Sequence, residues 1–190
     1  MSAIASVTFG RVCAARAASA AAVLLASLTI APAAEYGALA TFEGLPKAPI
    51  AATDLGGAPL SIAADPGRVT LVHFFASWCE PCVTELPELS RFAEERRDRV
   101  RFVGVNVAEP AVRAQKFAAR FALPGPVALD ENKSIASAFR VRGLPATVLI
   151  APGGATSLAA AGPLHWNSAE TARAIDGLAR SNKKPQGEQP

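Results

Sequence analysis

Two cysteines separated by two residues, Cys79 and Cys82, are the residues of this chain best suited to chemistry. A thiolate attacks disulfides, and a second thiol three residues away can attack the mixed disulfide that forms. The pair follows a run of β-branched and aromatic residues, Val69 to Phe75, and precedes a helical pattern. A cysteine at a helix N-terminus faces unsatisfied backbone N–H groups, which favour its thiolate. We therefore expect Cys79 to be the nucleophile and Cys82, more deeply buried, to resolve the mixed disulfide.

Two other uses of such a cysteine pair remain as alternatives. A zinc site needs two further ligands, but the third cysteine is Cys13 and the chain has only two histidines, His73 and His165. A structural disulfide between such close cysteines closes a very short loop and restricts the unfolded chain little. We therefore favour a redox-active disulfide between Cys79 and Cys82, with no metal and no separate cofactor.

The first 34 residues have the pattern of a secretory signal. Two arginines precede an uncharged apolar run from Ala17 to Ile30, and small residues follow up to Ala34. This run is shorter than the ~20 apolar residues of a membrane span. We expect cleavage after Ala33 or Ala34, with an uncleaved membrane anchor as the alternative. Residues 35–180 then form one domain. Residues 181–190, which have no apolar residue that could dock, form a disordered tail.

The charge balance gives no reason to expect nucleic acid as a partner. The chain has 19 basic and 16 acidic residues, and two of the basic ones lie in the predicted signal. Without the signal, 17 basic and 16 acidic residues remain, a formal net charge of +1. Loss of the signal also leaves only the two cysteines of the pair, an even count that suits an exported redox protein.

From residue 69 onward the pattern alternates buried strands with amphipathic helices. Strands are predicted at 69–75, 100–107, 127–129 and 155–161, and residues 143–150 are predicted as a turn that runs into another strand. Helices are predicted from the cysteines to about 97 and at 111–121, 134–139 and 167–180. Residues 36–67, rich in turn signals, are predicted as a short hairpin or edge strands. This order predicts an α/β fold of three layers, a sheet with helices on both faces.

Finer predictions concern two of these helices. In the helix at 111–121, we expect Val112, Phe117 and Phe121 to face inward. At the start of the last helix, Asn167 and Glu170 have the spacing of a capping box.

Together these features resemble the exported thiol-disulfide oxidoreductases of the TlpA/ResA group, in the thioredoxin superfamily and related to the CcmG/DsbE proteins. Residues 74–82, FFASWCEPC, are similar to the group's active site. Pro87 lies five residues after the second cysteine, where thioredoxins have a helix proline. Residues 143–145, GLP, resemble the loop with a cis-proline that faces the cysteines. The resemblance covers roughly residues 42–180 and implies a thioredoxin-like fold with a mixed central sheet.

The resemblance implies roles for residues around the cysteines. Leu144 and Pro145 would bind the client: a cis-proline has no N–H near the sulfurs, and the Leu144 backbone would pair with a client strand. Trp78 would flank the sulfurs together with Leu144 as an apolar docking surface. Pro81 suits the first helical turn, because the N–H it lacks would have no helical partner there.

Three polar residues near the cysteines are further candidates. His73 is six residues before Cys79, where thioredoxins bury an aspartate, so it is either a base for Cys82 or a packed core histidine. Glu80, between the cysteines, disfavours a neighbouring thiolate and should make the pair more reducing, unless solvent screens its charge. Glu109 resembles a glutamate near the active site of ResA-like proteins, with a position just before the next helix as the alternative.

The resemblance implies export to the periplasm and reduction of disulfides in client proteins, among them apocytochromes c and copper-site assembly factors for terminal oxidases. A membrane thiol transporter of the CcdA/DsbD type would supply electrons, and we expect a monomer. Two other functions remain open. One is a dithiol oxidase that donates its disulfide, and the other is a copper-handling thiol protein, although the only methionine is Met1.

Overall fold

The computed structural model describes residues 36–181, so the predicted signal and all but the first residue of the predicted tail lie outside it. The strands are β1 (Ala40–Thr41), β2 (Ile50–Thr53), β3 (Pro59–Ile62), β4 (Val69–Phe75), β5 (Val100–Val107), β6 (Val127–Asp130), β7 (Ala146–Ile150) and β8 (Ser157–Ala161). The helices are α1 (Glu80–Glu95), α2 (Ala111–Phe121), α3 (Ser134–Ala138) and α4 (Ala169–Arg180), with a 3₁₀ turn at Pro152–Gly154.

Six strands form one mixed sheet in the order β1-β8-β7-β4-β5-β6, and β2 and β3 form a separate hairpin. β4, β5 and β6 run parallel, whereas β7 is antiparallel to β4 and β8 is antiparallel to β7. From β4 onward, strands and helices follow one another in the predicted order. The hairpin and the edge strand β1 also lie in the segment where the sequence predicted them.

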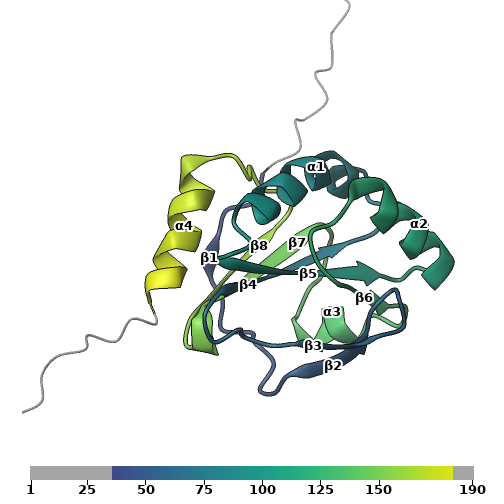
Figure 1. The fold of residues 1–190 in the computed structure, drawn as a ribbon, viewed down its shortest axis with the longest axis horizontal. Helices are drawn as coiled ribbons and strands as arrows, with labels where there is room; N and C mark the ends of the chain where they lie inside the picture. Colours follow the sequence, from purple (N-terminus) through teal and green to yellow (C-terminus); the bar gives the residue numbers. More distant parts are fainter. Residues whose placement is uncertain (1–35, 182–190) are drawn as a thin grey trace, which may run out of the picture. The chain divides into compact units, whose positions relative to one another are not determined.

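The two faces of the sheet are covered by different elements (Figure 1). Alternate residues of a strand point to opposite faces. Leu71 and Phe75 of β4 pack in a cluster with residues of α1, α2 and α4, whereas Val72 and Phe74 pack with α3 and the β2–β3 hairpin. Helices therefore lie on both faces, as predicted. β4, buried along its whole length, carries the chain to the start of α1.

One prediction about α2 is wrong. Val112, expected to face inward, is 65% exposed. The buried stripe of the helix contains Ala114 and Phe117, with Phe121 partly buried. Val112 precedes Ala114 by two residues, a rotation of more than half a turn at 3.6 residues per turn, so it points to the opposite side.

The start of α4 also differs from the prediction. Ser168, not Asn167, is the N-cap, and its hydroxyl accepts a hydrogen bond from the Thr171 backbone N–H at 3.1 Å. Asn167 instead donates its backbone N–H to a carboxylate oxygen of Glu88 on α1 at 3.1 Å. The residue before the cap therefore connects α4 to α1.

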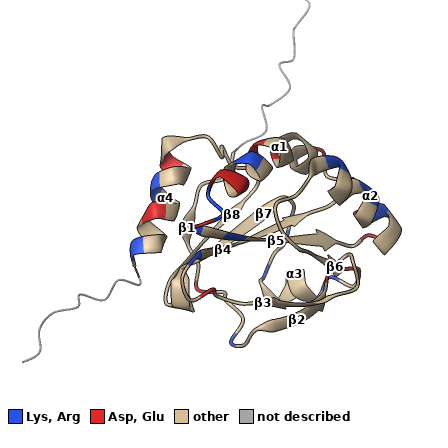
Figure 2. Ribbon diagram, viewed as in Figure 1, with Lys and Arg blue, Asp and Glu red and all other residues tan. Residues whose placement is uncertain are grey.

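Charged residues lie mainly on the helices and loops, and few lie on the central strands (Figure 2). Four ionisable side chains within residues 36–181 are buried: His73, Glu85, Glu109 and Asp130. Asp130 accepts backbone N–H groups at the start of α3 and so has a structural role. The other three lie on or next to the elements that carry the cysteines. Within the described residues, no helix combines the length and the apolar character needed to cross a membrane.

Candidate active site

Cys79 and Cys82 form a disulfide at the junction of β4 and α1, with their sulfurs 2.03 Å apart. Cys79 is the N-cap of α1, and its sulfur accepts the backbone N–H of Cys82 at 3.3 Å. Pro81 lies in the first turn of the helix. Cys79 retains 5% exposure, whereas Cys82 is completely buried. The predicted helix-terminal position of Cys79 and the deeper burial of Cys82 are both present.

Three side chains around the disulfide, those of Trp78, Glu80 and Leu144, are exposed or half-buried. Trp78 is 59% exposed, and Glu80 is also exposed. Leu144 is half-buried and packs against the core cluster that contains both cysteines. The Leu144–Pro145 peptide bond is cis. Trp78 and Leu144 are thus apolar side chains with surface left to contact another molecule, and their roles toward a client remain predictions.

Glu85 is a site residue that the sequence analysis missed. It lies on α1 three residues after Cys82, about one helical turn, so the two buried side chains share a face of the helix. Its Oε2 accepts the backbone N–H of Leu164 at 2.9 Å and the indole N–H of Trp166 at 3.3 Å. A sequence signal was available, since position 85 falls on the apolar stripe of the helix with Cys82 and Leu89.

Burial raises the pKa of Glu85 from 4.5 to about 7 because the ionised carboxylate loses its hydration. The hydrogen bonds from Leu164 and Trp166 favour the ionised form and offset part of this effect, whereas the charge of Glu88 raises the pKa further. Near neutral pH, Glu85 is therefore present in both its protonated and ionised forms. Such a group can accept a proton and return it.

His73 lies on β4 against Glu85, and it is fully buried. Its Nε2 is 3.2 Å from Glu85 Oε1, and its Nδ1 is 3.0 Å from the hydroxyl of Thr147, its direct cross-strand partner on β7. Burial lowers the pKa of His73 to about 3, so the imidazole is neutral at neutral pH. A ring with so low a pKa is a weak base. The structure therefore favours Glu85 over His73 as the acceptor of a proton from Cys82.

Glu109 connects the end of β5 to the loop before Cys79. One carboxylate oxygen accepts the backbone N–H of Ser77 at 2.7 Å and the side-chain N–H of Asn106 at 2.8 Å. The other oxygen accepts the Ser77 hydroxyl. Because Ser77 is two residues before Cys79, the buried Glu109 side chain holds the active-site loop rather than the start of α2.

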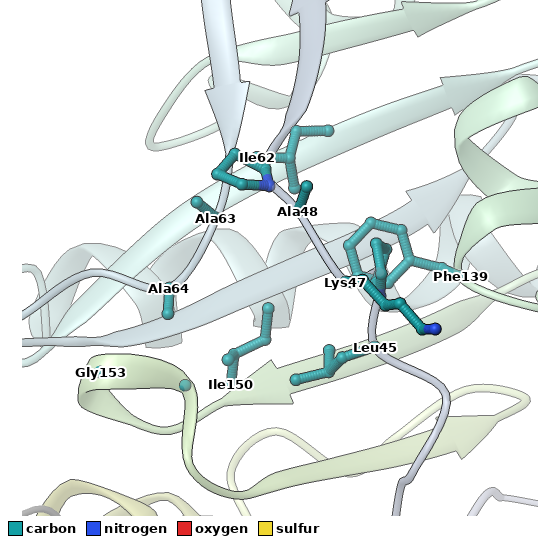
Figure 3. A pocket seen from close by; sticks show the side chains of 12 residues that line it. Leu45, Lys47, Ala48, Ile62, Ala63, Ala64, Phe139, Ile150 and Gly153 are labelled. Atoms are coloured by element: carbon teal, nitrogen blue, oxygen red, sulfur yellow. The ribbon is translucent and has the colours of Figure 1, made fainter.

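A cavity of about 350 Å³ lies on the other face of the sheet, away from the cysteines. Figure 3 shows Leu45, Phe139 and Ile150 lining it, from the segment before β2, the end of α3 and β7. Phe139 and Ile150 belong to the core cluster on the α3 face, whereas both cysteines belong to the cluster on the α1 face. The sheet separates this cavity from the disulfide. We take the disulfide, and not the cavity, as the candidate active site.

Residues 32–172 match the sequence model of the Redoxin family. The chain belongs to the Redoxin family. It is similar to the thiol-disulfide oxidoreductase ResA of Geobacillus kaustophilus, with 33% identity over 99 residues that cover 52% of this chain and 57% of that protein. It is also similar to the thiol:disulfide interchange protein CycY of Rhizobium leguminosarum bv. viciae, with 30% identity over 131 residues that cover 68% of this chain and 69% of that protein.

A solved structure of a thioredoxin-family thiol:disulfide interchange protein from Chlorobium tepidum shares the fold. Its TM-score is 0.62 at 25% identity, with 71% of this chain and 96% of that chain covered. The predicted thioredoxin-like fold is therefore confirmed for this Redoxin-family chain. The match to the Geobacillus kaustophilus ResA protein spans little more than half the length of that relative.

In this Redoxin-family chain, most of the residues predicted for the site lie on or beside two elements. His73 lies on β4, Trp78 and Cys79 lie in the junction that follows, and the start of α1 carries Glu80, Pro81 and Cys82. Leu144 and Pro145 lie on the loop that leads into β7, the neighbour of β4. The arrangement provides a buried cysteine pair, a titratable carboxyl group on the same helix face and apolar surface beside them. Such an arrangement suits thiol-disulfide exchange.

Proposed function

We propose that the protein is an exported thiol-disulfide oxidoreductase that reduces disulfides in client proteins. The observation that carries this proposal is the Cys79–Cys82 disulfide at the start of α1, with the Glu85 carboxyl group buried one turn beyond Cys82. The names of the relatives, thiol-disulfide oxidoreductase ResA and thiol:disulfide interchange protein CycY, support the same chemistry.

In the first step, the Cys79 thiolate of the reduced protein attacks one sulfur of a client disulfide. A sulfur–sulfur bond forms between Cys79 and the client, and the client disulfide breaks and releases its other sulfur as a thiolate. The backbone N–H groups at the start of α1 favour the attacking thiolate. Cys79 is better placed for this attack than Cys82, because Cys82 is completely buried.

In the second step, Cys82 gives its proton to Glu85 and attacks the Cys79 sulfur. The bond between Cys79 and the client breaks, and the client leaves with its second thiolate. Two electrons have then passed to the client, and Cys79 and Cys82 share a disulfide. Glu85 suits the proton transfer because its pKa of about 7 is close to the pH at which the reaction runs.

The client would dock on the apolar surface beside the disulfide. Trp78 offers an exposed ring, and Leu144 offers a half-buried side chain from the loop before β7. The Leu144 backbone would pair with an extended client segment in the manner of an added strand.

Export and electron supply follow from the same proposal. Residues 1–34 would direct the chain to the periplasm and then be cleaved or kept as an anchor. Each turnover consumes two electrons, which a membrane thiol transporter of the CcdA/DsbD type would restore. The clients would be apocytochromes c or copper-site assembly factors of terminal oxidases, and the protein would act as a monomer.

Replacing Cys82 with serine tests the assigned order of attack. Reduced Cys82→Ser protein should form a mixed disulfide with a peptide that has an internal disulfide, and should retain it, because no thiol is left to resolve it. Peptide mass spectrometry after acid quenching would locate the adduct and distinguish Cys79 from Cys13. Cys79→Ser is the matched control and should form at least tenfold less adduct, since a buried thiol reacts slowly. Equal adducts in the two variants would contradict the assignment.

A further inference from the structure

His73, Glu85 and Thr147 form a buried row of polar groups on the α1 face of the sheet. The groups at both ends of this row are hydrogen-bonded. The Thr147 hydroxyl is hydrogen-bonded to His73 Nδ1, and the N–H groups of Leu164 and Trp166 donate to Glu85 Oε2. The central contact is different. His73 Nε2 and Glu85 Oε1 are 3.2 Å apart, yet neither has a hydrogen bond of ordinary geometry within residues 36–181.

Two buried polar atoms this close are stable only if a proton lies between them. Either atom can supply that proton. A protonated carboxyl group donates, and an ionised one accepts, while each nitrogen of a neutral imidazole donates or accepts according to the tautomer. The contact can therefore be satisfied in both protonation states of Glu85, provided that the tautomer of His73 changes between them.

We propose that His73 is a positioning residue for Glu85 that changes tautomer whenever Glu85 gains or loses its proton. The proposal rests on the function proposed above, in which Glu85 accepts the proton of Cys82. His73 itself stays neutral throughout and gains no net proton.

The two protonation states of Glu85 differ in the direction of both hydrogen bonds that the His73 ring makes. With Glu85 protonated, its O–H donates to His73 Nε2, and the N–H at Nδ1 donates to the Thr147 hydroxyl. With Glu85 ionised, the ring proton is at Nε2 and donates to the carboxylate, and the Thr147 hydroxyl donates to Nδ1. One proton leaves Glu85 between the states, and the imidazole carries one ring proton in each.

Thr147 makes the tautomer change of His73 feasible because a hydroxyl both donates and accepts hydrogen bonds. It is 1% exposed and lies directly opposite His73 in the register of β4 and β7. A backbone carbonyl or amide at the same place would hold the ring in one tautomer. The hydroxyl leaves both tautomers with a partner, so no buried nitrogen is left without one.

The charged and titratable groups around this row are few. On α1 they are Glu88, whose charge raises the pKa of Glu85, and Cys82 in its reduced form. The segment before α4 contributes Leu164 and Trp166, which do not titrate, and β7 contributes Thr147. Because burial also keeps His73 neutral, Glu85 is the titrating member of the pair near neutral pH.

Nitrogen-15 NMR of the oxidised full-length chain tests the proposal directly. The chain has only two histidines, so labelled histidine gives two sets of ring signals, and a His165→Gln variant assigns them. The His73 signals should change from the Nδ1–H to the Nε2–H pattern as pH rises, with a midpoint near the Glu85 pKa of about 7. They should not show the doubly protonated pattern there. In Glu85→Gln the His73 tautomer should be independent of pH.

Thr147→Val and Thr147→Ser form a matched pair for the same measurement. Valine keeps the β-branched shape but removes the hydroxyl, so an N–H at Nδ1 has no acceptor. The Nε2–H tautomer is then favoured, and the Glu85 midpoint should move down by about one pH unit, a tenfold change in proton affinity. Serine keeps a hydroxyl and should restore the wild-type midpoint. Dispersed amide spectra would establish that each variant is folded.

A single His73 tautomer across the titration of Glu85 in the wild-type chain would overturn the proposal, and this result does not depend on any variant. Equal midpoints in the valine and serine variants would overturn the role of Thr147. Neither result depends on turnover, because both are measured on the resting disulfide form. The proposed reductase function would fail separately, through the Cys82→Ser trapping experiment.

Discussion

Two buried side chains with opposite pKa shifts meet next to the active-site cysteines. His73 has its pKa lowered from 6.5 to about 3 by burial, so it contributes stability that is present above pH 6.5 and lost as pH falls. Glu85 has its pKa raised from 4.5 to about 7, mainly by burial, so it contributes stability that is present below pH 4.5 and lost as pH rises toward 7. Between pH 4.5 and 6.5 the two dependences oppose each other.

Single substitutions should reveal how His73 and Glu85 each make stability depend on pH. In His73→Asn, the free energy of unfolding relative to wild type should fall with rising pH between 4.5 and 6.5, by up to about 1.4 kcal/mol per pH unit. In Glu85→Gln the free energy of unfolding relative to wild type should rise with pH between 4.5 and 6.5, with a similar slope. Urea unfolding at several pH values measures both, with Glu94→Gln on the exposed side of α1 as a control. Parallel profiles for wild type and the two variants would contradict the assigned shifts.

We expect Glu80, which lies between the two cysteines, to act on them through its charge. An exposed carboxylate next to Cys79 disfavours the thiolate and so destabilises the reduced form. Glu80→Gln should therefore raise the reduction potential of the couple by roughly 20 mV. Redox equilibration in glutathione buffers measures it. Glu95→Gln, at the other end of α1 and roughly 22 Å away along the helix, is the matched control. A fall in potential for Glu80→Gln, or equal shifts in both variants, would contradict this account.

At the scale of elements, the loop between β4 and α1 is held by Glu109, two residues beyond the end of β5. Glu109 accepts three hydrogen bonds, two of them from Ser77 in the loop. The segment that follows β5 thus fixes the backbone that precedes α1. This contact positions Cys79 without touching either sulfur.

Glu109→Gln should weaken this brace, because the amide nitrogen cannot accept the hydrogen bonds that a carboxylate oxygen accepts. We expect a loss of about 1–3 kcal/mol in unfolding free energy and faster hydrogen exchange at the Ser77 amide. Chemical denaturation and amide exchange measure the two effects. Glu131→Gln is the control, since Glu131 is exposed and, among residues 36–181, accepts a single hydrogen bond, from the N–H of Ala111. Unchanged Ser77 exchange in Glu109→Gln would show that the brace does not hold the loop.

At the scale of the whole molecule, periodicity and turn residues predicted the order of strands and helices from β4 onward. The position of Cys79 as helix cap also followed from local sequence, because it depends on a strand running directly into a helix. The mixed sheet was expected from the family resemblance alone. Residue patterns do not state which strands pair, and β4 is central because β5 and β7 pair with its two edges.

The interior of the site could not be predicted in the same way. Glu85 has hydrogen-bond donors 79 and 81 residues later in the chain, in Leu164 and Trp166. Such partners depend on where α4 and the segment before it pack. The prediction that Val112 faces inward was wrong for a related reason. An apolar residue near a helix end can lie on the buried or the exposed face of the helix, and tertiary packing decides between them. The sequence drew attention to His73, but its contact with Glu85 could be seen only in the structure.

The central claim is that the Cys79–Cys82 couple reduces client disulfides, and its reduction potential tests that claim most directly. The purified protein would be equilibrated in glutathione or dithiothreitol buffers, and the fraction of free thiols at the two cysteines would be read by alkylation and mass spectrometry. The account predicts a value near or below about −230 mV, toward that of thioredoxin. A value near about −120 mV, like that of a strong disulfide donor, would mean that the protein oxidises its clients and would contradict the account.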